Sequence, residues 1–155
     1  MQEIYMRRAI ELAKKGIGAV NPNPLVGAVI VKDGRIIGEG YHRRYGELHA
    51  ERDAFAHLTE DAAGAEMYVT LEPCQMCAGA IVQARIPKVV IGCMNPKAGC
   101  AGSILNLLDM KQFNHQVEVT RGIMETECSA MMSGFFAELR AKKKAAALKE
   151  NNGMS

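Results

Sequence analysis

The segments His49-Ala50-Glu51 and Pro73-Cys74-Gln75-Met76-Cys77 carry the side chains of a catalytic zinc site. One imidazole and two thiolates provide three zinc ligands, and a catalytic zinc site keeps its fourth position for water or substrate. Zinc lowers the pKa of such a water to about 7, which makes hydroxide available near neutral pH. The sequence therefore predicts one Zn²⁺ per chain, with His49, Cys74 and Cys77 as its ligands.

The spacing within each segment separates the ligands from a proton-transfer group. Cys74 and Cys77 are three residues apart, so their sulfur atoms lie on the same face of a helix. Pro73 favours a helix start, where its missing N–H costs nothing, and a helix N-terminus stabilises thiolates. His49 and Glu51 are two residues apart and diverge on a helix, which argues against both being ligands. We therefore expect Glu51 to move protons to and from the zinc-bound water.

The complete pattern, H-x-E followed by P-C-x-x-C, is a signature of zinc-dependent nucleobase deaminases. In that reaction hydroxide attacks a ring carbon bearing an exocyclic amine, and Glu51 would pass protons to the ring nitrogen and to the leaving ammonia. Two other interpretations remain open. The C-x-x-C pair alone is compatible with a redox motif, and the same ligands could stabilise a non-catalytic binding subunit. Glu51 argues against the binding subunit, since a structural zinc site has no use for that carboxylate.

Composition and length indicate a single globular domain. We expect residues 1–150 to form one zinc-dependent deaminase domain, followed by a disordered tail at residues 151–155. The hydrophobic content of 48% is ordinary for a folded protein, and no apolar run approaches the ~18 residues that span a membrane. The chain has five cysteines. Because two of them are assigned to the metal, we expect no disulfide framework and a cytoplasmic protein.

Hydrophobic periodicity predicts helices that alternate with strands. Helices are expected at residues 3–15, 49–58, 75–84, 104–108 and 125–149, and strands at residues 25–31, 36–41, 67–71, 88–92 and 116–119. Asp33-Gly34 predicts a two-residue hairpin turn between the first two strands. This order predicts an α/β fold in which helices cover both faces of a five-stranded mixed sheet, with the site at the strand ends.

The C-terminal segment is basic, although the net charge of the whole chain is only +2. Its predicted RNA-binding residues are Arg140, Lys142, Lys143 and Lys144. Two interpretations are open for this segment. A basic helix binds phosphate backbones, but cations at the end of a helix also complement the helix dipole without any partner.

The second part of the chain, residues ~67–149, resembles bacterial tRNA-specific adenosine deaminases of the cytidine-deaminase-like superfamily. The matching segments are residues 68–80 (YVTLEPCQMCAGA), 98–103 (AGCAGS) and 127–136 (ECSAMMSGFF). The resemblance implies a three-layer α/β/α sandwich, conversion of the wobble adenosine of tRNA to inosine, and a homodimer. It also implies that the final helix holds the tRNA anticodon stem-loop. Asn95 stands where many of these enzymes have an acidic residue, and it is a predicted substrate contact.

The first part of the chain, residues ~5–64, is similar instead to the pyrimidine deaminase domain of riboflavin biosynthesis. The matching segments are residues 21–29 (NPNPLVGAV), 40–42 (GYH) and 46–52 (GELHAER). This similarity implies an alternative substrate, a small phosphoribosylated diaminopyrimidine nucleotide, whose ring Asn23 and His42 would contact. The tRNA family usually has Asn in place of His42. The riboflavin enzymes have a longer, Lys-containing insert where this chain has only Gln75-Met76 between its cysteines, so we favour tRNA as the substrate.

Overall fold

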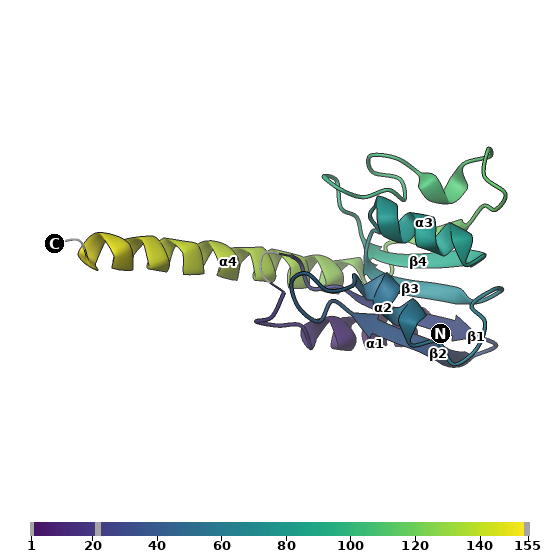
Figure 1. Cartoon of the computed structure of the whole chain (residues 1–155), viewed down its shortest axis with the longest axis horizontal. Helices are drawn as coiled ribbons and strands as arrows, with labels where there is room; N and C mark the ends of the chain where they lie inside the picture. Colours follow the sequence, from purple (N-terminus) through teal and green to yellow (C-terminus); the bar gives the residue numbers. More distant parts are fainter. Residues whose placement is uncertain (1, 21–22, 154–155) are drawn as a thin grey trace.

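One five-stranded mixed sheet lies between two layers of helices (Figure 1). The computed structural model describes residues 2–20 and 23–153. In chain order, the elements of these ranges are α1 (Gln2–Lys14), β1 (Gly27–Lys32), β2 (Arg35–Tyr41), α2 (Ala50–Ala56), β3 (Glu66–Leu71), α3 (Gln75–Gln83), β4 (Lys88–Cys93), the 3₁₀ turn η1 (Leu107–Asp109), β5 (Glu118–Arg121) and α4 (Glu125–Gly153). The expected three-layer α/β/α sandwich is therefore confirmed.

The strands follow the order β2-β1-β3-β4-β5 across the sheet. β1 is antiparallel to both of its neighbours, whereas β3, β4 and β5 run parallel to one another. The β1–β2 connection is the expected two-residue turn, in which Asp33 (φ 51°) and Gly34 (φ 73°) both have positive φ. Positive φ at both positions is the conformation of a type I′ turn, whose twist matches that of the flanking strands.

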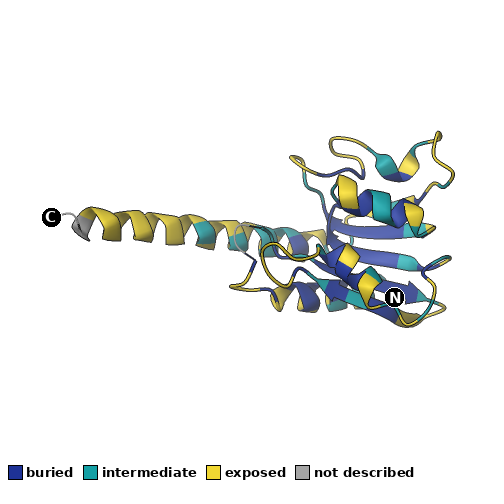
Figure 2. Ribbon diagram, viewed as in Figure 1, coloured by how far each residue is buried: buried dark blue, intermediate teal, exposed yellow. Residues whose placement is uncertain are grey.

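The helices are held on the two faces of the sheet by separate apolar clusters. On one face pack α1 and the start of α4, where Met6 and Cys128 share a buried cluster with side chains of β1, β3 and β4. On the other face pack α2 and α3, where Ala54 and Ile81 share a second cluster with the same three strands. Figure 2 shows these buried strands between half-exposed helices. Because α2 and α3 lie on one face, the segments that precede them are brought together.

Four strands bring their ends to one edge of the sheet. The parallel strands β3 and β4 end there, at Leu71 and Cys93, and the antiparallel β1 begins there. β2 also ends at this edge, because it is antiparallel to β1. Gly40 allows α2 to approach, since a Cβ at position 40 would overlap the backbone of Ala50 and Ala54. Residues that precede β1 or follow β2, β3 and β4 therefore meet at this edge.

Two predicted elements in the region after β4 are wrong in type or position. The helix expected at residues 104–108 is replaced by η1, and the side chains of Ile104 and Leu105 are exposed. The N–H groups of Ile104 and Leu107 donate to the carbonyls of Gly99 and Cys100, so this segment is hydrogen-bonded back to the preceding loop. β5 begins at Glu118, two residues later than expected.

α4 is the longest helix, and its C-terminal half projects away from the sheet (Figure 1). It extends to Gly153, past its expected end at Lys149, so residues 151–153 of the expected tail are helical. Residues 154–155 lie outside the described ranges. Within α4, residues 140–151 are exposed throughout. Over the described ranges, no helix is both long and apolar enough to cross a membrane.

Candidate metal centre

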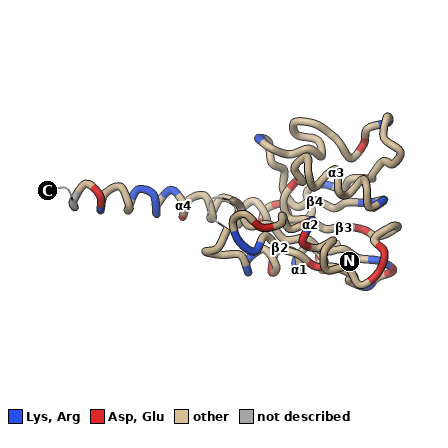
Figure 3. Tube along the Cα trace, in the orientation of Figure 1, with Lys and Arg blue, Asp and Glu red and all other residues tan. Residues whose placement is uncertain are grey.

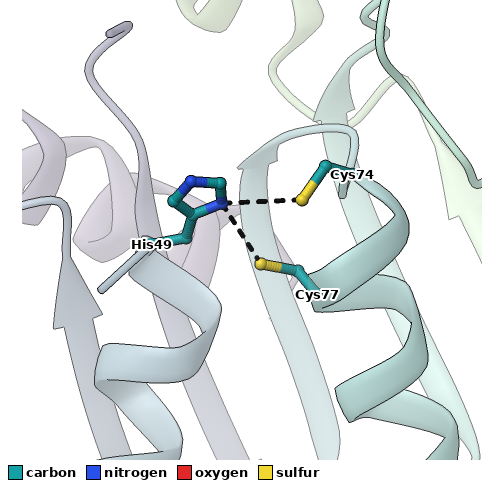
Figure 4. A group of neighbouring side chains, drawn as sticks. All are labelled: His49, Cys74 and Cys77. Carbon is teal, nitrogen blue, oxygen red and sulfur yellow. Dashed lines mark hydrogen bonds between the residues drawn. The ribbon is translucent and has the colours of Figure 1, made fainter. Parts of the chain in front are cut away.

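His49, Cys74 and Cys77 form a compact cluster at this edge of the sheet (Figure 4). His49 Nδ1 lies 3.5 Å from the sulfur of Cys74 and 3.5 Å from the sulfur of Cys77. His49 is the N-cap residue of α2 and Cys74 is the N-cap residue of α3, and both have an extended backbone. The positive ends of two helices therefore point toward the cluster, which favours thiolate ligands.

The separations between these atoms fit tetrahedral zinc. Zn–N bonds of about 2.0–2.1 Å and Zn–S bonds of about 2.3 Å, at a tetrahedral angle, place nitrogen and sulfur about 3.5 Å apart. The distances from His49 to both cysteines agree with this value. All the ligand atoms lie within 4.8 Å of one another. The three predicted ligands can therefore hold a single zinc ion, whose fourth position is then free for water.

The two cysteines differ in how strongly they hold a proton. A hydrogen bond from the Cys77 thiol lowers the pKa of Cys74 to about 5, and the same bond raises the pKa of Cys77 above its usual range. The Cys77 thiol thus donates its proton to the Cys74 sulfur. Zinc binds thiolates, so its binding would release this proton.

Glu51 lies beside the cluster and is only 4% exposed. Burial raises the pKa of its carboxyl to about 7. We expected His49 and Glu51 to diverge on one helix, but α2 begins at Ala50 and His49 has an extended backbone. Both side chains consequently line the same cavity. A carboxyl group with a pKa near neutrality can accept a proton and donate it again at that pH.

A cavity of about 180 Å³ adjoins His49, Glu51 and Cys74. Its lining includes all three predicted substrate contacts, Asn23, His42 and Asn95. This volume lies below the ~300–1,000 Å³ of sites that enclose drug-sized ligands. Of the described residues that line it, none is Lys or Arg. The cavity therefore suits an uncharged ring, while the charged parts of a substrate would remain outside.

His42 is 4% exposed, and both of its ring nitrogens have protein partners. Nδ1 lies 2.9 Å from the carbonyl oxygen of Leu48, and Nε2 lies 3.1 Å from Nδ2 of Asn23. A carbonyl oxygen only accepts, so Nδ1 carries the proton in the neutral ring and Nε2 accepts from the Asn23 amide. Among the described residues, no other partner is found for the second amide hydrogen or the oxygen of Asn23. His42 lines the cavity and also orients the side chain of Asn23, which lines the same cavity. Asn21 and Pro22, which precede Asn23 in the motif, lie outside the described residues.

Glu72 also lines the cavity, and no sequence pattern assigned it a role. It is 3% exposed and directly follows β3. The sequence does contain a signal for it, because an acidic residue at the end of an apolar strand requires partners if it is buried. Those partners belong to a loop more than 20 residues away in the chain, so sequence alone does not identify them.

The four basic residues expected to bind RNA lie on the exposed part of α4. They are Arg140, Lys142, Lys143 and Lys144. None of them lines the cavity. Figure 3 shows the positive charge along the projecting half of this helix. The remaining cysteines, Cys93, Cys100 and Cys128, are buried and unbridged.

Comparison with known proteins relates the chain to zinc-binding deaminases. Residues 1–93 match the family described as the cytidine and deoxycytidylate deaminase zinc-binding region. The chain is 45% identical, over 153 residues, to the tRNA-specific adenosine deaminase of Bacillus subtilis (strain 168). That alignment covers 93% of this chain and 94% of the Bacillus protein.

Two solved structures represent the two groups of relatives. A diaminohydroxyphosphoribosylaminopyrimidine deaminase/5-amino-6-(5-phosphoribosylamino)uracil reductase of Thermotoga maritima has a TM-score of 0.75 at 44% identity. It covers 91% of this chain, which spans 42% of that protein. A tRNA:A34 deaminase, which edits A to I at the wobble position, has a TM-score of 0.73 at 32% identity, covering 83% of this chain and 98% of its own. The chain thus spans nearly all of two tRNA deaminases and less than half of the bifunctional protein.

Proposed function

Because the chain belongs to the cytidine and deoxycytidylate deaminase family of zinc-binding proteins, we propose that it converts adenosine to inosine at the wobble position of tRNA. The reaction class expected from the sequence, zinc-dependent hydrolytic deamination, is confirmed by this membership. The observation that carries the proposal is the arrangement of Glu51 and the His49–Cys74–Cys77 cluster around one cavity.

The roles of the individual residues follow from their chemistry. Zinc held by His49, Cys74 and Cys77 would supply the Lewis acidity that makes water a nucleophile near neutral pH. Glu51 takes a proton from the attacking water and delivers it to the ring nitrogen. It then transfers the second water proton to the departing amine, so that water and the aminated base become ammonia and the oxo base. Glu51 ends the cycle in the protonation state in which it began.

The base would be held by the side chains on the other walls of the cavity. Asn23 has an amide oxygen and one amide hydrogen beyond its bond to His42, which together match the amine and N7 of adenine. We propose that Asn23 contacts the base and that His42 orients Asn23. Asn95 lies on the wall formed by the loop after β4.

Several features support tRNA as the substrate. Lys and Arg are absent from the described lining of the cavity, so the phosphates of the substrate must be bound elsewhere. The exposed half of α4 carries Arg140, Lys142, Lys143 and Lys144, and a basic helix attracts a phosphate backbone. The Bacillus relative of nearly the same length is a tRNA-specific adenosine deaminase. RNA deaminases also require the target base to be splayed out into a pocket.

One specific observation favours the alternative substrate, a phosphoribosylated diaminopyrimidine. Asn23 and His42, the pair implied by the riboflavin-type similarity, are hydrogen-bonded to each other at the cavity. The third interpretation, a non-catalytic binding subunit, leaves the burial of Glu51 beside the metal ligands without a purpose. A buried carboxyl with a raised pKa lowers the stability of the fold, and such groups are concentrated at functional sites.

A side-by-side assay tests the proposal. One zinc-loaded preparation receives a tRNA anticodon stem-loop and, separately, the phosphoribosylated diaminopyrimidine, and ammonia release is measured. We expect release with the stem-loop and inosine at its wobble position. Ammonia from the pyrimidine alone would refute the tRNA assignment. If neither substrate reacts while zinc is bound, the catalytic interpretation itself is wrong.

We further propose that residues 1–150 form one domain and that the protein is a cytoplasmic homodimer. Apolar side chains beside the metal centre support an interface there, because Leu48 and Met76 line a hollow next to His49 and are exposed by 39% and 54%. Exposed apolar groups that gather near one site are typical of interfaces between subunits. Sedimentation equilibrium would measure the mass, and a monomer at micromolar concentration would contradict the dimer.

A further inference from the structure

Glu72 is a buried carboxylate that the proposed reaction does not use. It is 3% exposed and is followed directly by Pro73 and the metal ligand Cys74. The described residues give it no ion pair. A buried charge without a cationic partner is unfavourable unless hydrogen bonds replace its hydration. The groups that replace the hydration of the Glu72 carboxylate therefore indicate what this residue does.

All the side-chain partners of Glu72 lie in the loop of residues 95–103. Oε1 accepts a hydrogen bond from the backbone N–H of Asn95 at 2.9 Å and another from the Ser103 hydroxyl. Oε2 accepts from the backbone N–H groups of Ala101 and Ser103, each at 2.9 Å. Burial raises the pKa of Glu72, but the bonds from Ser103, Asn95 and Ala101 outweigh burial and hold the pKa below its ordinary value. One carboxylate thus joins the two ends of this loop.

The loop of residues 95–103 is in direct contact with Glu72 along its length. A methyl group at position 99 would overlap the Glu72 carboxylate, so a larger residue there would have to displace this carboxylate from its hydrogen bonds. The backbone holds the same arrangement, because Glu72 N–H donates to Cys93 O at 2.9 Å and Cys100 N–H donates to Pro73 O at 2.8 Å. These bonds tie the loop to the end of β3, and the carboxylate satisfies the N–H groups of Asn95, Ala101 and Ser103.

This loop contributes Asn95 and Ala98 to the lining of the cavity. We infer that Glu72 is a positioning residue for the substrate: it holds the loop of residues 95–103 so that Asn95 and Ala98 form one wall of the ring-binding cavity. The inference rests on the proposed function of that cavity. Glu72 then acts on substrate binding through the loop, and it is not needed to hold zinc.

Glu72→Gln tests this inference with little change in shape. A glutamine side chain has one oxygen and one NH₂ group, whereas both carboxylate oxygens of Glu72 accept from backbone N–H groups. In either orientation of the Gln side chain, its NH₂ group faces at least one backbone N–H group, and two donors cannot form a hydrogen bond with each other. The better orientation directs it toward Asn95 N–H, because the Ser103 hydroxyl can reverse its role and accept. The variant should therefore release the end of the loop that carries Asn95.

We expect Glu72→Gln to keep about one zinc per chain, to raise KM at least roughly tenfold, and to change kcat less. Amide exchange at Asn95 should become faster in the zinc-loaded protein. Ser103→Ala removes only the hydroxyl donor and should shift KM in the same direction by a smaller factor. Glu66→Gln is the matched control, since Glu66 begins the same strand, accepts from the Tyr68 hydroxyl and does not line the cavity. It should match the wild type in KM and in exchange at Asn95.

Loss of zinc from folded Glu72→Gln would overturn the inference, because Glu72 would then support the metal ligand. Unchanged KM together with a lower melting temperature would also overturn it, since the role would be structural only. If Glu72→Gln does not fold, Ser103→Ala decides by its KM and its exchange. The exchange measurement needs no substrate, so it tests the hold of Glu72 on the loop even if neither proposed substrate reacts, whereas KM tests the role in substrate binding.

Discussion

At the scale of single side chains, Glu51 and the zinc ligands have separable tasks. Glu51 is buried beside the cluster but does not belong to it. Glu51→Ala should keep zinc and fold while lowering kcat by roughly 10²–10⁴-fold, because general acid–base catalysis contributes about that much. Metal analysis and ammonia release measure both quantities. Glu47→Ala, which removes an exposed acid from the same segment, should leave both unchanged. A Glu51→Ala protein that keeps more than a tenth of wild-type kcat would show that another group moves the protons.

Asn23 and His42 should act as a unit, because His42 Nε2 accepts from the Asn23 amide. If two side chains contact the base independently, their substitutions have additive effects on the free energy of substrate binding. If one side chain acts only through the other, its substitution has no further effect once the other is removed. We expect Asn23→Ala and His42→Ala each to raise KM, and the double variant to raise it no more than Asn23→Ala alone. Zinc content checks that His49, whose ring lies edge-on to His42, is undisturbed. Additive effects on KM would mean that His42 contacts the base itself.

At the scale of elements, α4 is the part of the chain whose role depends most on a partner. Its residues 140–151 are exposed throughout, so they add little to the stability of the sheet. A variant with Lys142, Lys143 and Lys144 all changed to Gln should bind the stem-loop more weakly. The slope of log K against log salt should also become shallower, by about 0.7–0.9 for each phosphate that the variant no longer neutralises. Deamination of a small pyrimidine substrate should be unaffected.

The matched control for α4 keeps the charge and changes the side chain. Replacement of the same three lysines by Arg should preserve both the affinity and the salt slope, because phosphate attraction depends on charge. Filter binding at several salt concentrations measures both variants. An unchanged slope in the Gln variant would favour the alternative in which these cations only complement the end of the helix.

At the scale of the whole molecule, zinc joins the segments that precede α2 and α3. Both helices pack on the same face of the sheet, so the metal adds a cross-link between His49 and the two cysteines. Ligands that bind only the folded state stabilise it by mass action. Cys74→Ala should therefore lose zinc and unfold at a lower temperature, and a chelator should lower the melting temperature of the wild type only.

A buried cysteine outside the cluster provides the control for this measurement. Cys93 is 5% exposed and donates to the Thr70 carbonyl, so Cys93→Ala loses some packing but no ligand. It should retain about one zinc per chain and respond to the chelator as the wild type does. If Cys74→Ala also kept its zinc, His49 and Cys77 would have to bind the metal with a ligand from elsewhere, and the assigned site would be incorrect.

The amino-acid sequence was sufficient for the features that depend on near neighbours in the chain. The Cys74–Cys77 spacing at a helix start and the Asp33-Gly34 turn were both predicted from local patterns, and the structure contains both. The order of helices and strands also predicted the three-layer fold, because the alternation of strands with helices restricts a mixed sheet to few arrangements.

Other features depend on contacts between segments that are far apart in the chain. Glu72 and Ser103 are 31 residues apart, and the segment after residue 103, where a helix was expected, is hydrogen-bonded back to Gly99 and Cys100 of the preceding loop. The bond that occupies His42 crosses 19 residues to Asn23. The sequence shows Glu72 and His42 at these positions, but it does not show which groups form hydrogen bonds with them. A buried polar group takes whichever partner the packed chain brings within hydrogen-bond distance, and that partner is determined only when the sheet has assembled.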